Sequence, residues 1–561
     1  MKNLLVTSLT NNKKTKLKKI IIGKWCFGSY FPEKKIFNNI ENNFSLNKKK
    51  KILQNSMDIE DKLFEKIYKV LNNFHNIKYN KKQWKIILGH WLRLYIRVFS
   101  NRYIHLSKIL KKKKINYFYY TEDLTNGESN EIINFVEKIK DDNFNDVIYK
   151  KIIDFRGTNI DVRKKVIKSK TKKNKKFNIF NLFNLFFYKR DKILIAEPYL
   201  KKIDNILLHL NLSIIPRFWN NSRFSNYSEI NLDLRENLRK KIKIKTKNLY
   251  TFLFSNVFDY MPKAYLEDFK NISKYVKKKY PVNPKIILTA NSFFFNETFK
   301  NFVAQNYKKT KYCVLQHGNN YQSHFDEHNR SIEEDTSHYF LSWFKYPKSK
   351  KYIEACMQKK IDKNGIGESL LILHWPFDQR DKIWDNFDEY TFYIKRTRLM
   401  LKKISSLKNI KSISYRVSHN HENIDGLNYL NKISKKIEFD FSKYTYNQSI
   451  NNSKIAIFTY NSSGFYENLS NNIPSLMIIE KSYLLELNNS SRKYFKDLMK
   501  SDIIFTDINV LCKFLKKNWN NIDNWWTLQS TQSSVEKFVR KNAIRSNKPF
   551  RTISNKLKNI I

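Results

Sequence analysis

The sequence is poor in residues that interrupt or cross-link a chain: its 561 residues include 10 glycines, 10 prolines and 4 cysteines. The cysteines Cys26, Cys313, Cys356 and Cys512 lie far apart and form no C-x-x-C pair. This spacing argues against a zinc knuckle, a disulfide framework and a thioredoxin-like motif, and it fits a reducing compartment.

Long apolar runs are also absent, since none reaches the roughly 18 residues that a membrane span requires. The best candidate, Phe177–Tyr188, is interrupted by Asn and flanked by Lys and Arg, which favours a buried segment or an interfacial helix. The first residues contain too few apolar side chains for a signal peptide. We therefore expect a cytoplasmic protein, or one held peripherally at the inner face of the membrane.

Acidic residues are scarce: 51 Asp and Glu stand against 106 Lys and Arg, which gives a formal net charge of +55. The lysines occur throughout the chain, and no zinc-finger, homeodomain or RNA-recognition signature is present. We attribute the charge to compositional bias together with an anionic substrate, and we expect no nucleic-acid partner. Affinity for the phosphate headgroups of a membrane would be a by-product.

Hydrophobic residues make up 41% of the chain and aromatic residues 15%, enough to bury the cores of two or three globular domains. Met57–His75 and Trp84–Tyr103 have apolar residues at helical spacing. The remaining pattern alternates short apolar strands with helical segments. The expected strands are Ile20–Phe27, Ile115–Tyr120, Ile193–Ile195, Leu212–Ile215, Ile286–Ala290, Tyr312–Leu315, Leu370–Leu373, Ile413–Val417, Ile455–Phe458, Leu476–Ile479 and Ile503–Phe505.

This alternation is typical of βαβ units and therefore of parallel sheets covered by helices on both faces. A change in composition between residues 346 and 367 suggests a boundary. The predicted fold class is α/β, with two Rossmann-like domains that face a cleft and with extra N-terminal helices. The first domain covers residues 1–346 and the second residues 365–561.

The sharpest candidate site follows the strand Ile455–Phe458, where Asn461, Ser462, Ser463 and Gly464 precede a predicted helix. Such a turn presents serine hydroxyls, unpaired backbone N–H groups and the positive end of a helix dipole, which together suit a phosphate. Glu467 lies one turn later, within reach of a ribose hydroxyl. The alternative is an ordinary helix N-cap by Asn461 or Ser462, and the sequence does not decide between the two.

A second candidate, Gln316-His317-Gly318-Asn319, follows the strand Tyr312–Leu315, and Tyr321 lies just beyond it. Open parallel sheets bind ligands at the carboxyl ends of their strands, and a histidine there can act as a base near neutral pH. The alternative is a structural histidine that caps a loop. Because glycine is rare in this chain, Gly318 and Gly464 are candidates for positive φ or for close backbone approach.

Other polar clusters carry weaker signals. His324, Asp326, Glu327 and His328, like His419, His421 and Glu422, lack the helical H-E-x-x-H frame and fit solvated loops, so we expect no metal site. Arg416 on a predicted strand either neutralises a diphosphate or pairs with a carboxylate. The aromatic segment Trp519–Phe538 favours packing over a sugar-stacking platform.

The chain resembles, over nearly its full length, a family of transferases encoded among O-antigen and other surface-carbohydrate genes. The pieces that carry this resemblance occur in a fixed order. They are Gly23–Cys26, Trp84–Trp91, Gln316–Gly318, Tyr339–Trp343, Ser453–Pro474 and Trp525–Trp526. More distantly, the Gln-His-Gly and strand–Ser–Ser–helix–Asn–x–Pro pieces are similar to those of CDP-glycerol glycerophosphotransferases and other enzymes with the glycosyltransferase-B fold.

The resemblance implies a donor nucleotide bound mainly by the C-terminal domain, an acceptor bound on the N-terminal side, and no metal or other cofactor. It implies a donor site at Ser462, Ser463, Gly464 and Glu467, and a base or phosphate-contacting role for His317. The sequence departs from the family pattern at three positions: Asn319 and Gln322 replace expected glycines, and Lys24 replaces an acidic residue.

The resulting hypothesis is a glycosyltransferase that moves a group from a nucleotide-activated donor to a glycan or lipid-linked acceptor during bacterial surface-polysaccharide synthesis. One alternative is glycerophosphate-type transfer from a CDP-alcohol. Another is a non-catalytic basic protein that binds nucleic acid or an anionic glycan. The sequence does not identify the donor, the acceptor or the stereochemical outcome.

Overall fold

The computed structural model describes most of the chain. The described residues are 2–7, 17–22, 45–121, 128–165, 191–217, 223–241, 246–326, 331–347, 349–365, 367–374, 387–417, 427–430 and 433–560. Among them, no helix combines the length and the apolar character needed to cross a membrane. The predicted segment Phe177–Tyr188 lies outside this part of the chain.

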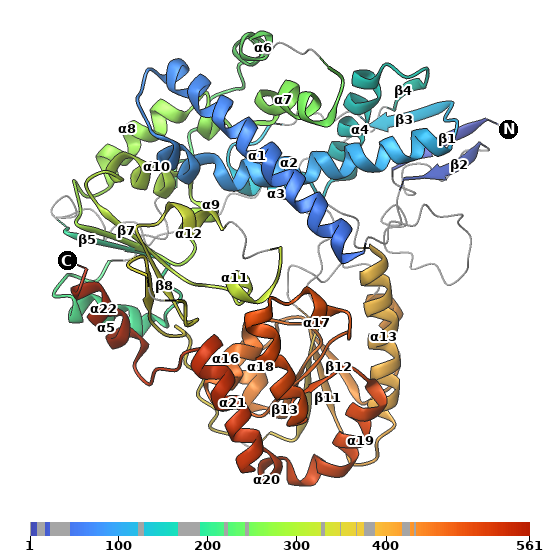
Figure 1. The fold of residues 1–561 in the computed structure, drawn as a ribbon, viewed down its shortest axis with the longest axis vertical. Helices are drawn as coiled ribbons and strands as arrows, with labels where there is room; N and C mark the ends of the chain where they lie inside the picture. Colours follow the sequence, from blue (N-terminus) through green and yellow to red (C-terminus); the bar gives the residue numbers. More distant parts are fainter. Residues whose placement is uncertain are drawn as a thin grey trace.

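The first layer is a four-stranded sheet in the order β2-β1-β3-β4, with every neighbouring pair parallel. Its strands are β1 (Asn3–Val6), β2 (Lys18–Ile21), β3 (Tyr117–Thr121) and β4 (Asp161–Lys165). Two long helices, α1 (Leu46–His75) and α2 (Lys81–Lys112), cross the N-terminal half and are longer than the predicted ones (Figure 1). Asn80 and Gln83 form a reciprocal capping box that fixes where α2 begins.

The second sheet has five parallel strands in sequential order, β5 to β9. They are β5 (Ile193–Ala196), β6 (Ile286–Thr289), β7 (Lys311–Leu315), β8 (Tyr339–Ser342) and β9 (Tyr352–Glu354). The helices of this half other than α1 and α2 are α3 (Ile132–Lys138), α4 (Asp142–Arg156), α5 (Lys202–Asn211), α6 (Leu232–Lys240), α7 (Leu249–Tyr260), α8 (Phe269–Lys279), α9 (Ser292–Phe295), α10 (Glu297–Asn306), α11 (Asn320–Ser323) and α12 (Ile332–Thr336), with a 3₁₀ turn at Lys263–Tyr265.

The third sheet forms the lower half of Figure 1 and has the order β12-β11-β10-β13-β14-β15, again all parallel. Its strands are β10 (Ser369–Leu373), β11 (Ile413–Arg416), β12 (Ile437–Asp440), β13 (Ser453–Phe458), β14 (Ser475–Ile478) and β15 (Ile504–Phe505). The helices that follow β10 are α13 (Phe387–Ser405), α14 (Leu427–Leu430), α15 (Tyr446–Asn451), α16 (Ser463–Ser470), α17 (Tyr483–Glu486), α18 (Asn489–Lys500), α19 (Ile508–Asn518), α20 (Ile522–Thr527), α21 (Gln529–Asn542) and α22 (Pro549–Lys558), with a 3₁₀ turn at Trp519–Asn521.

The α/β class with parallel sheets is confirmed, and so are most of the predicted strands. The predicted strand Leu212–Ile215 is wrong: Leu212 closes α5 as its buried C-cap, and Ser213 follows with a φ of 56°. Leu212 is buried at the end of the helix, residues 213–217 form no strand, and Ile215 is exposed. Five of the observed strands were not predicted: β1, β4, β8, β9 and β12. Of these, β4 (DVRKK) and β12 (IEFD) are charged or half-exposed edge strands without an apolar run.

The structure differs from the expected layout of the N-terminal half in three ways. A separate sheet, β1 to β4, precedes β5 to β9, and β9 lies beyond residue 346. In addition, α22 returns from the end of the chain to pack against α5 (Figure 1). Its Ile553 and Leu557 are fully buried in one apolar cluster with Ile195 and Leu288 of the five-stranded sheet. The C-terminal helix therefore belongs to the core of the N-terminal half.

A short segment after β7 joins the two halves. The Phe325 amide donates to the Glu486 carbonyl oxygen (3.1 Å), and the Asn488 amide donates to the Ser323 carbonyl oxygen (3.0 Å). Between these bonds, His324 Nε2 lies 3.0 Å from Glu486 Oε2 and its Nδ1 lies 2.8 Å from Asp326 Oδ1. Burial lowers the pKa of His324, but the hydrogen bonds to Asp326 and Glu486 outweigh it and raise the pKa to about 9.

We predict a pH-dependent contribution of His324 to stability. Because the folded pKa of about 9 exceeds the ordinary 6.5, the contribution is complete below pH 6.5 and is lost as the pH rises through 9. His324→Gln should lower the free energy of unfolding by about 1–3 kcal/mol at pH 6, the usual range for hydrogen bonds to a charged group. It should lower it much less at pH 10. Urea unfolding at both pH values measures this, and an equal loss at both would contradict it.

We also predict that residue 367 tolerates only glycine. A Cβ atom at Gly367 would lie 1.9 Å from the Asn452 carbonyl carbon and 2.2 Å from the Ser453 nitrogen, both backbone atoms at the start of β13. Gly367→Ala should therefore destabilise the protein by about 3 kcal/mol or more. Gly318→Ala is the matched control, since its Cβ would meet its nearest neighbour at 3.9 Å. Equal unfolding midpoints for the two variants would refute the prediction.

Candidate functional site

The turn after β13 is the amino terminus of α16. Ser462 is the N-cap, and its hydroxyl accepts a hydrogen bond from the Phe465 amide at 3.4 Å. The capping interpretation is therefore correct for Ser462. It does not exclude binding, because the backbone N–H groups of Ser463 and Gly464 belong to the first helical turn, which has no carbonyl partners within the helix. These amides form the positive end of the helix dipole.

This turn lines a cavity of about 790 Å³ between the two halves of the protein. The lining residues come from the carboxyl ends of strands in both sheets and from the connection between β9 and β10. They are Tyr199, Leu200, Lys201, Asn319, Lys359, Lys360, Ile361, Leu373, Tyr446, Asn447, Tyr460, Asn461, Ser462, Ser463, Gly464 and Glu467. In the six-stranded sheet the strand order reverses between β10 and β13. The cavity therefore lies at a topological switch point, where open α/β sheets bind ligands.

Asn319 brings the two predicted motifs together. Its side-chain nitrogen donates to Asn461 Oδ1 at 3.1 Å, and its side-chain oxygen accepts from the Ser463 hydroxyl at 3.3 Å. Asn461 in turn donates to the Tyr483 hydroxyl at 3.0 Å. The loop after β7 and the start of α16 thus form one hydrogen-bonded unit. The residue that replaces an expected glycine makes this link, which a glycine cannot make.

The charged groups of the cavity are mostly cations. Lys359 Nζ lies 3.4 Å from Glu467 Oε1 and 5.9 Å from the centre of the Tyr199 ring, and Lys201 Nζ lies 2.7 Å from Asp362 Oδ2. Burial raises the pKa of Glu467, and the charge of Lys359 opposes that rise. With three lysines and a helix amino terminus facing one carboxylate on the cavity wall, the site has the electrostatic character of an anion site.

The constraint at Gly464 is space and not its backbone angle. A Cβ atom there would lie 3.1 Å from Phe458 Cε1 and 3.2 Å from the Tyr446 hydroxyl. Gly318 meets neither expectation, since no positive φ is found there and its surroundings leave room for a Cβ. Gly318 instead accepts a hydrogen bond through its carbonyl oxygen from Gln316 Nε2 at 2.8 Å.

Gln316 is fully buried and holds the loop after β7. Its Oε1 accepts hydrogen bonds from the Ser342 hydroxyl (2.7 Å) and the Trp343 amide (3.2 Å). These bonds tie the carboxyl end of β7 to that of β8. Gln316 therefore fixes the backbone beside His317 and lies outside the cavity wall.

His317 lies next to the cavity, behind Tyr199. The two rings stack with centroids 6.1 Å apart, and Tyr199 itself lines the cavity. Phe293 packs on the imidazole at 5.4 Å, and Nδ1 lies 3.0 Å from the Tyr321 hydroxyl. Burial lowers the pKa of His317 to about 4, so the imidazole is neutral at pH 7 and able to accept a proton.

Two other predicted groups lie elsewhere. The Arg416 guanidinium pairs with the buried Asp440 (2.5 Å) and donates to the Tyr444 carbonyl (2.9 Å) and the Ser449 hydroxyl (2.8 Å). Arg416 is not among the residues that line the cavity, and its hydrogen bonds stabilise the end of β11, which fits the alternative of pairing with a carboxylate. Trp525 and Trp526 are buried, as the packing interpretation predicts.

The metal candidates offer little. His324 pairs with Asp326 and with Glu486, as described above. The other candidates, Glu327, His328, His419, His421 and Glu422, lie outside the described residues. Within the described ranges, no group of three or more His, Cys, Asp or Glu side chains is arranged to hold a metal ion.

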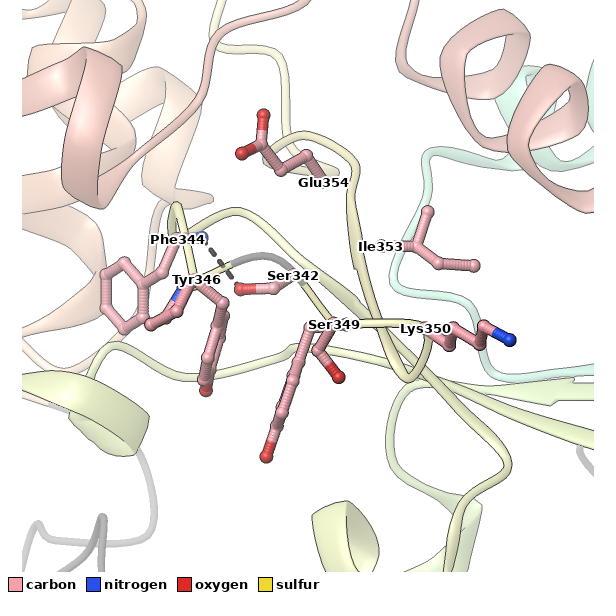
Figure 2. Close-up of a pocket in the computed structure, with 9 residues that line it drawn as sticks. Ser342, Phe344, Tyr346, Ser349, Lys350, Ile353 and Glu354 are labelled. Atoms are coloured by element: carbon pink, nitrogen blue, oxygen red, sulfur yellow. Dashed lines mark hydrogen bonds between the residues drawn. The ribbon is translucent and has the colours of Figure 1, made fainter.

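A second hollow, of about 570 Å³, lies at the connection of β8 and β9 (Figure 2). Figure 2 shows Phe344 donating its amide to the Ser342 hydroxyl at 2.8 Å. Tyr346 and Tyr352 stack there with ring centroids 4.1 Å apart and nearly parallel planes. None of the predicted site residues lines this hollow.

Sequence reasoning missed several cavity residues: Tyr199, Lys201, Lys359, Lys360, Tyr446 and Tyr460. The lysines carry no distinguishing signal in a chain with 106 Lys and Arg. Tyr199 is distinguished in the structure by a φ of 56°, and the sequence does not reveal this conformation.

Comparisons with known proteins give one decisive match. No curated protein matches the chain significantly. Among solved structures, the UDP-GlcNAc 2-epimerase from Neisseria meningitidis bound to UDP-GlcNAc is similar at 11% identity and a TM-score of 0.36, over 66% of this chain and 100% of that one. The wall teichoic acid polymerase TagF is similar at 14% identity and a TM-score of 0.35, over 66% and 88%. MurG from Acinetobacter baumannii is similar at 7% identity and a TM-score of 0.33, over 65% of this chain and 99% of that one.

At these TM-scores the solved structures do not identify residue roles, which therefore rest on the geometry of this chain. The family comparison covers almost the whole sequence, since the model described as LIC12162 family transferase matches residues 2–557. This span includes both halves, the cavity between them and all the residues that line it. The chain therefore belongs to the LIC12162 family of transferases.

Proposed function

We propose that this transferase moves a glycosyl group from a nucleotide-activated donor, and that the donor diphosphate binds in the cavity at the amino terminus of α16. The supporting observation is the convergence on one cavity of the Ser463 and Gly464 amides from one half with Lys359 and Lys201 from the opposite wall. Fixed dipoles and cations of this kind stabilise the negative charge that develops on a departing nucleotide.

Each remaining group has a proposed part in the reaction. Glu467, one turn along α16, accepts hydrogen bonds from ribose hydroxyls once Lys359 turns toward the phosphates. His317 takes the proton of the acceptor hydroxyl, which then attacks the anomeric carbon while the nucleotide diphosphate leaves. For this step Tyr199 must move aside, because its ring covers the imidazole. No metal is assigned a part.

The acceptor we propose is a growing glycan or a lipid-linked sugar, and the biological setting is bacterial surface-polysaccharide synthesis, with peripheral attachment to anionic membrane. The order of the sequence pieces that carry the family resemblance and the net charge of +55 support this setting. Transfer of glycerol phosphate from a CDP-alcohol would use the same anion site. Assays with labelled nucleotide sugars and CDP-alcohols separate the two reactions.

We predict that Lys359→Ala weakens binding of the donor nucleotide. Lys359 is about half exposed, so its contribution should be on the order of 1 kcal/mol, about a fivefold increase in Kd. Thermal-shift titrations with UDP, CDP, GDP and CMP identify the nucleotide, because a ligand of the native state raises the midpoint. The effect of Lys359→Ala should be larger for a nucleoside diphosphate than for the matching monophosphate.

Lys411→Ala is the matched control for this experiment. Lys411 is an exposed lysine that precedes the amino end of β11, whereas the cavity lies at the carboxyl ends of the strands. It should leave nucleotide binding unchanged. If no nucleotide shifts the midpoint of the wild-type protein, or if both lysine variants weaken binding equally, the proposed anion site is rejected.

We predict that His317→Ala lowers kcat by about 10²–10⁴-fold, the usual contribution of a general base. Nucleotide affinity should remain within about twofold of the wild-type value, since His317 lies behind the cavity wall. Turnover with the identified donor, circular dichroism and nucleotide titration are measured on the same preparation. Full activity in the folded variant would remove His317 from the mechanism while leaving the donor site intact.

A further inference from the structure

We propose that Tyr321 and Glu333 are positioning residues that fix the tautomer of His317, so that its Nε2 carries the lone pair that accepts a proton. The three side chains form a continuous hydrogen-bonded line. The Tyr321 hydroxyl lies 3.0 Å from His317 Nδ1 on one side and 2.5 Å from Glu333 Oε1 on the other. This inference rests on the proposed function of His317 and adds two residues to it.

Counting protons along the line gives the tautomer. The phenol of Tyr321 has one proton, and a carboxylate oxygen of Glu333 can only accept. The Tyr321 O–H is therefore donated to Glu333. The phenol oxygen is left as an acceptor for the His317 Nδ1–H, which makes the neutral imidazole protonated at Nδ1 and unprotonated at Nε2. In the opposite tautomer Nδ1 would carry a lone pair and the Tyr321 proton could satisfy only one neighbour. If it went to His317, the lone pairs of Tyr321 and Glu333 would face each other. If it went to Glu333, the lone pairs of Tyr321 and His317 would do so.

The protonation states needed for this count hold at neutral pH. Burial and the charge of Glu333 raise the pKa of Tyr321 far above its ordinary value, so the phenol keeps its proton. Burial raises the pKa of Glu333 to about 6, which leaves the carboxylate ionised at pH 7. Both side chains are less than a tenth exposed, so solvent competes little for these bonds.

The surrounding packing holds the line in place. Tyr321 belongs to α11, four residues after His317, and Glu333 belongs to the first turn of α12. His90 of α2 lies behind the carboxylate, with Nε2 3.6 Å from Glu333 Oε2, and its ring stacks on Phe293. Phe293 also packs on the His317 imidazole, so His90 and His317 contact the same aromatic ring.

The neighbouring residue provides a matched control. Glu334 is as buried as Glu333 and also accepts a hydrogen bond from a tyrosine, but its partner is Tyr346 (2.7 Å) and not Tyr321. Both glutamates belong to α12. Replacing either one by methionine removes its carboxylate and keeps a side chain of similar length. Only the change at Glu333 should reach His317.

The test measures the tautomer directly by ¹⁵N NMR on protein labelled at its 11 histidines, with the His317 signal assigned by its loss in His317→Ala. The wild type should show Nδ1–H. In Glu333→Met the Tyr321 proton turns to His317, and the signal should change to Nε2–H, whereas Glu334→Met should match the wild type. Tyr321→Phe should leave a mixture of tautomers, because Nδ1–H loses its acceptor.

Turnover is measured on the same variants. Glu333→Met should lower kcat by roughly 10²-fold or more, with little change in the KM for the donor, because the wrong nitrogen faces the acceptor. Glu333→Gln should retain more activity than Glu333→Met, since its amide oxygen can still accept the Tyr321 proton. Glu334→Met should retain wild-type turnover.

The outcomes distinguish this inference from the proposed function. A wild-type His317 that carries its proton on Nε2, or a tautomer unchanged in Glu333→Met, overturns the inference whatever the activity does. A tautomer that changes as expected without loss of kcat supports the positioning by Glu333 but removes His317 as the base. If Glu333→Met does not fold, the wild-type spectrum and Tyr321→Phe still decide the question.

Discussion

The structure of the candidate site depends on the side-chain amide of Asn319, which donates to Asn461 and accepts from Ser463. One amide group thereby fixes the loop after β7 against the start of α16. Both partners belong to the turn at the start of α16, so the bonds determine the distance between the proposed anion-binding turn and the loop that carries His317. A hydrogen bond buried to this extent is difficult to exchange for water, so the arrangement is well defined.

The charges around the cavity are already paired before a ligand arrives. Lys359 contacts Glu467 and Lys201 contacts Asp362. An anionic ligand therefore competes with carboxylates for these lysines, whereas the amides at the start of α16 have no such competitor within the helix. In the proposed anion site, the amides at the start of α16 are therefore the fixed part. The lysines supply an adjustable part that responds to the ligand.

The proposed role of His317 in proton transfer depends more on its hydrogen bonds than on its pKa. Its burial among aromatic rings keeps it neutral, which leaves open the question of which nitrogen is the acceptor. The line through Tyr321 to Glu333 answers that question with groups that lie outside the cavity. The contact between His324 and Glu486 follows a few residues later on the same segment. One stretch of chain thus connects the tautomer of the imidazole with the contact between the halves.

The sequence by itself determined the α/β class, most strands of the two larger sheets and the turn at Ser462–Gly464, because these depend on local patterns: apolar strands, helical spacing and capping residues. It also pointed to the loop at His317, since a histidine after a strand marks the binding edge of a parallel sheet. It did not reveal that Arg416 is occupied by Asp440, or that Leu212 ends a helix.

Only the tertiary structure decided which groups share the cavity. Tyr199 and Lys201 reach it from the segment after β5, Lys359 reaches it from a distant part of the chain, and Glu333 reaches His317 through a tyrosine. Such contacts depend on how the sheets pack against each other and on which side chains become buried. The spacing of residues along a lysine-rich sequence does not predict them. The sequence specified the elements and their signature turns. The packing between the halves specified the site.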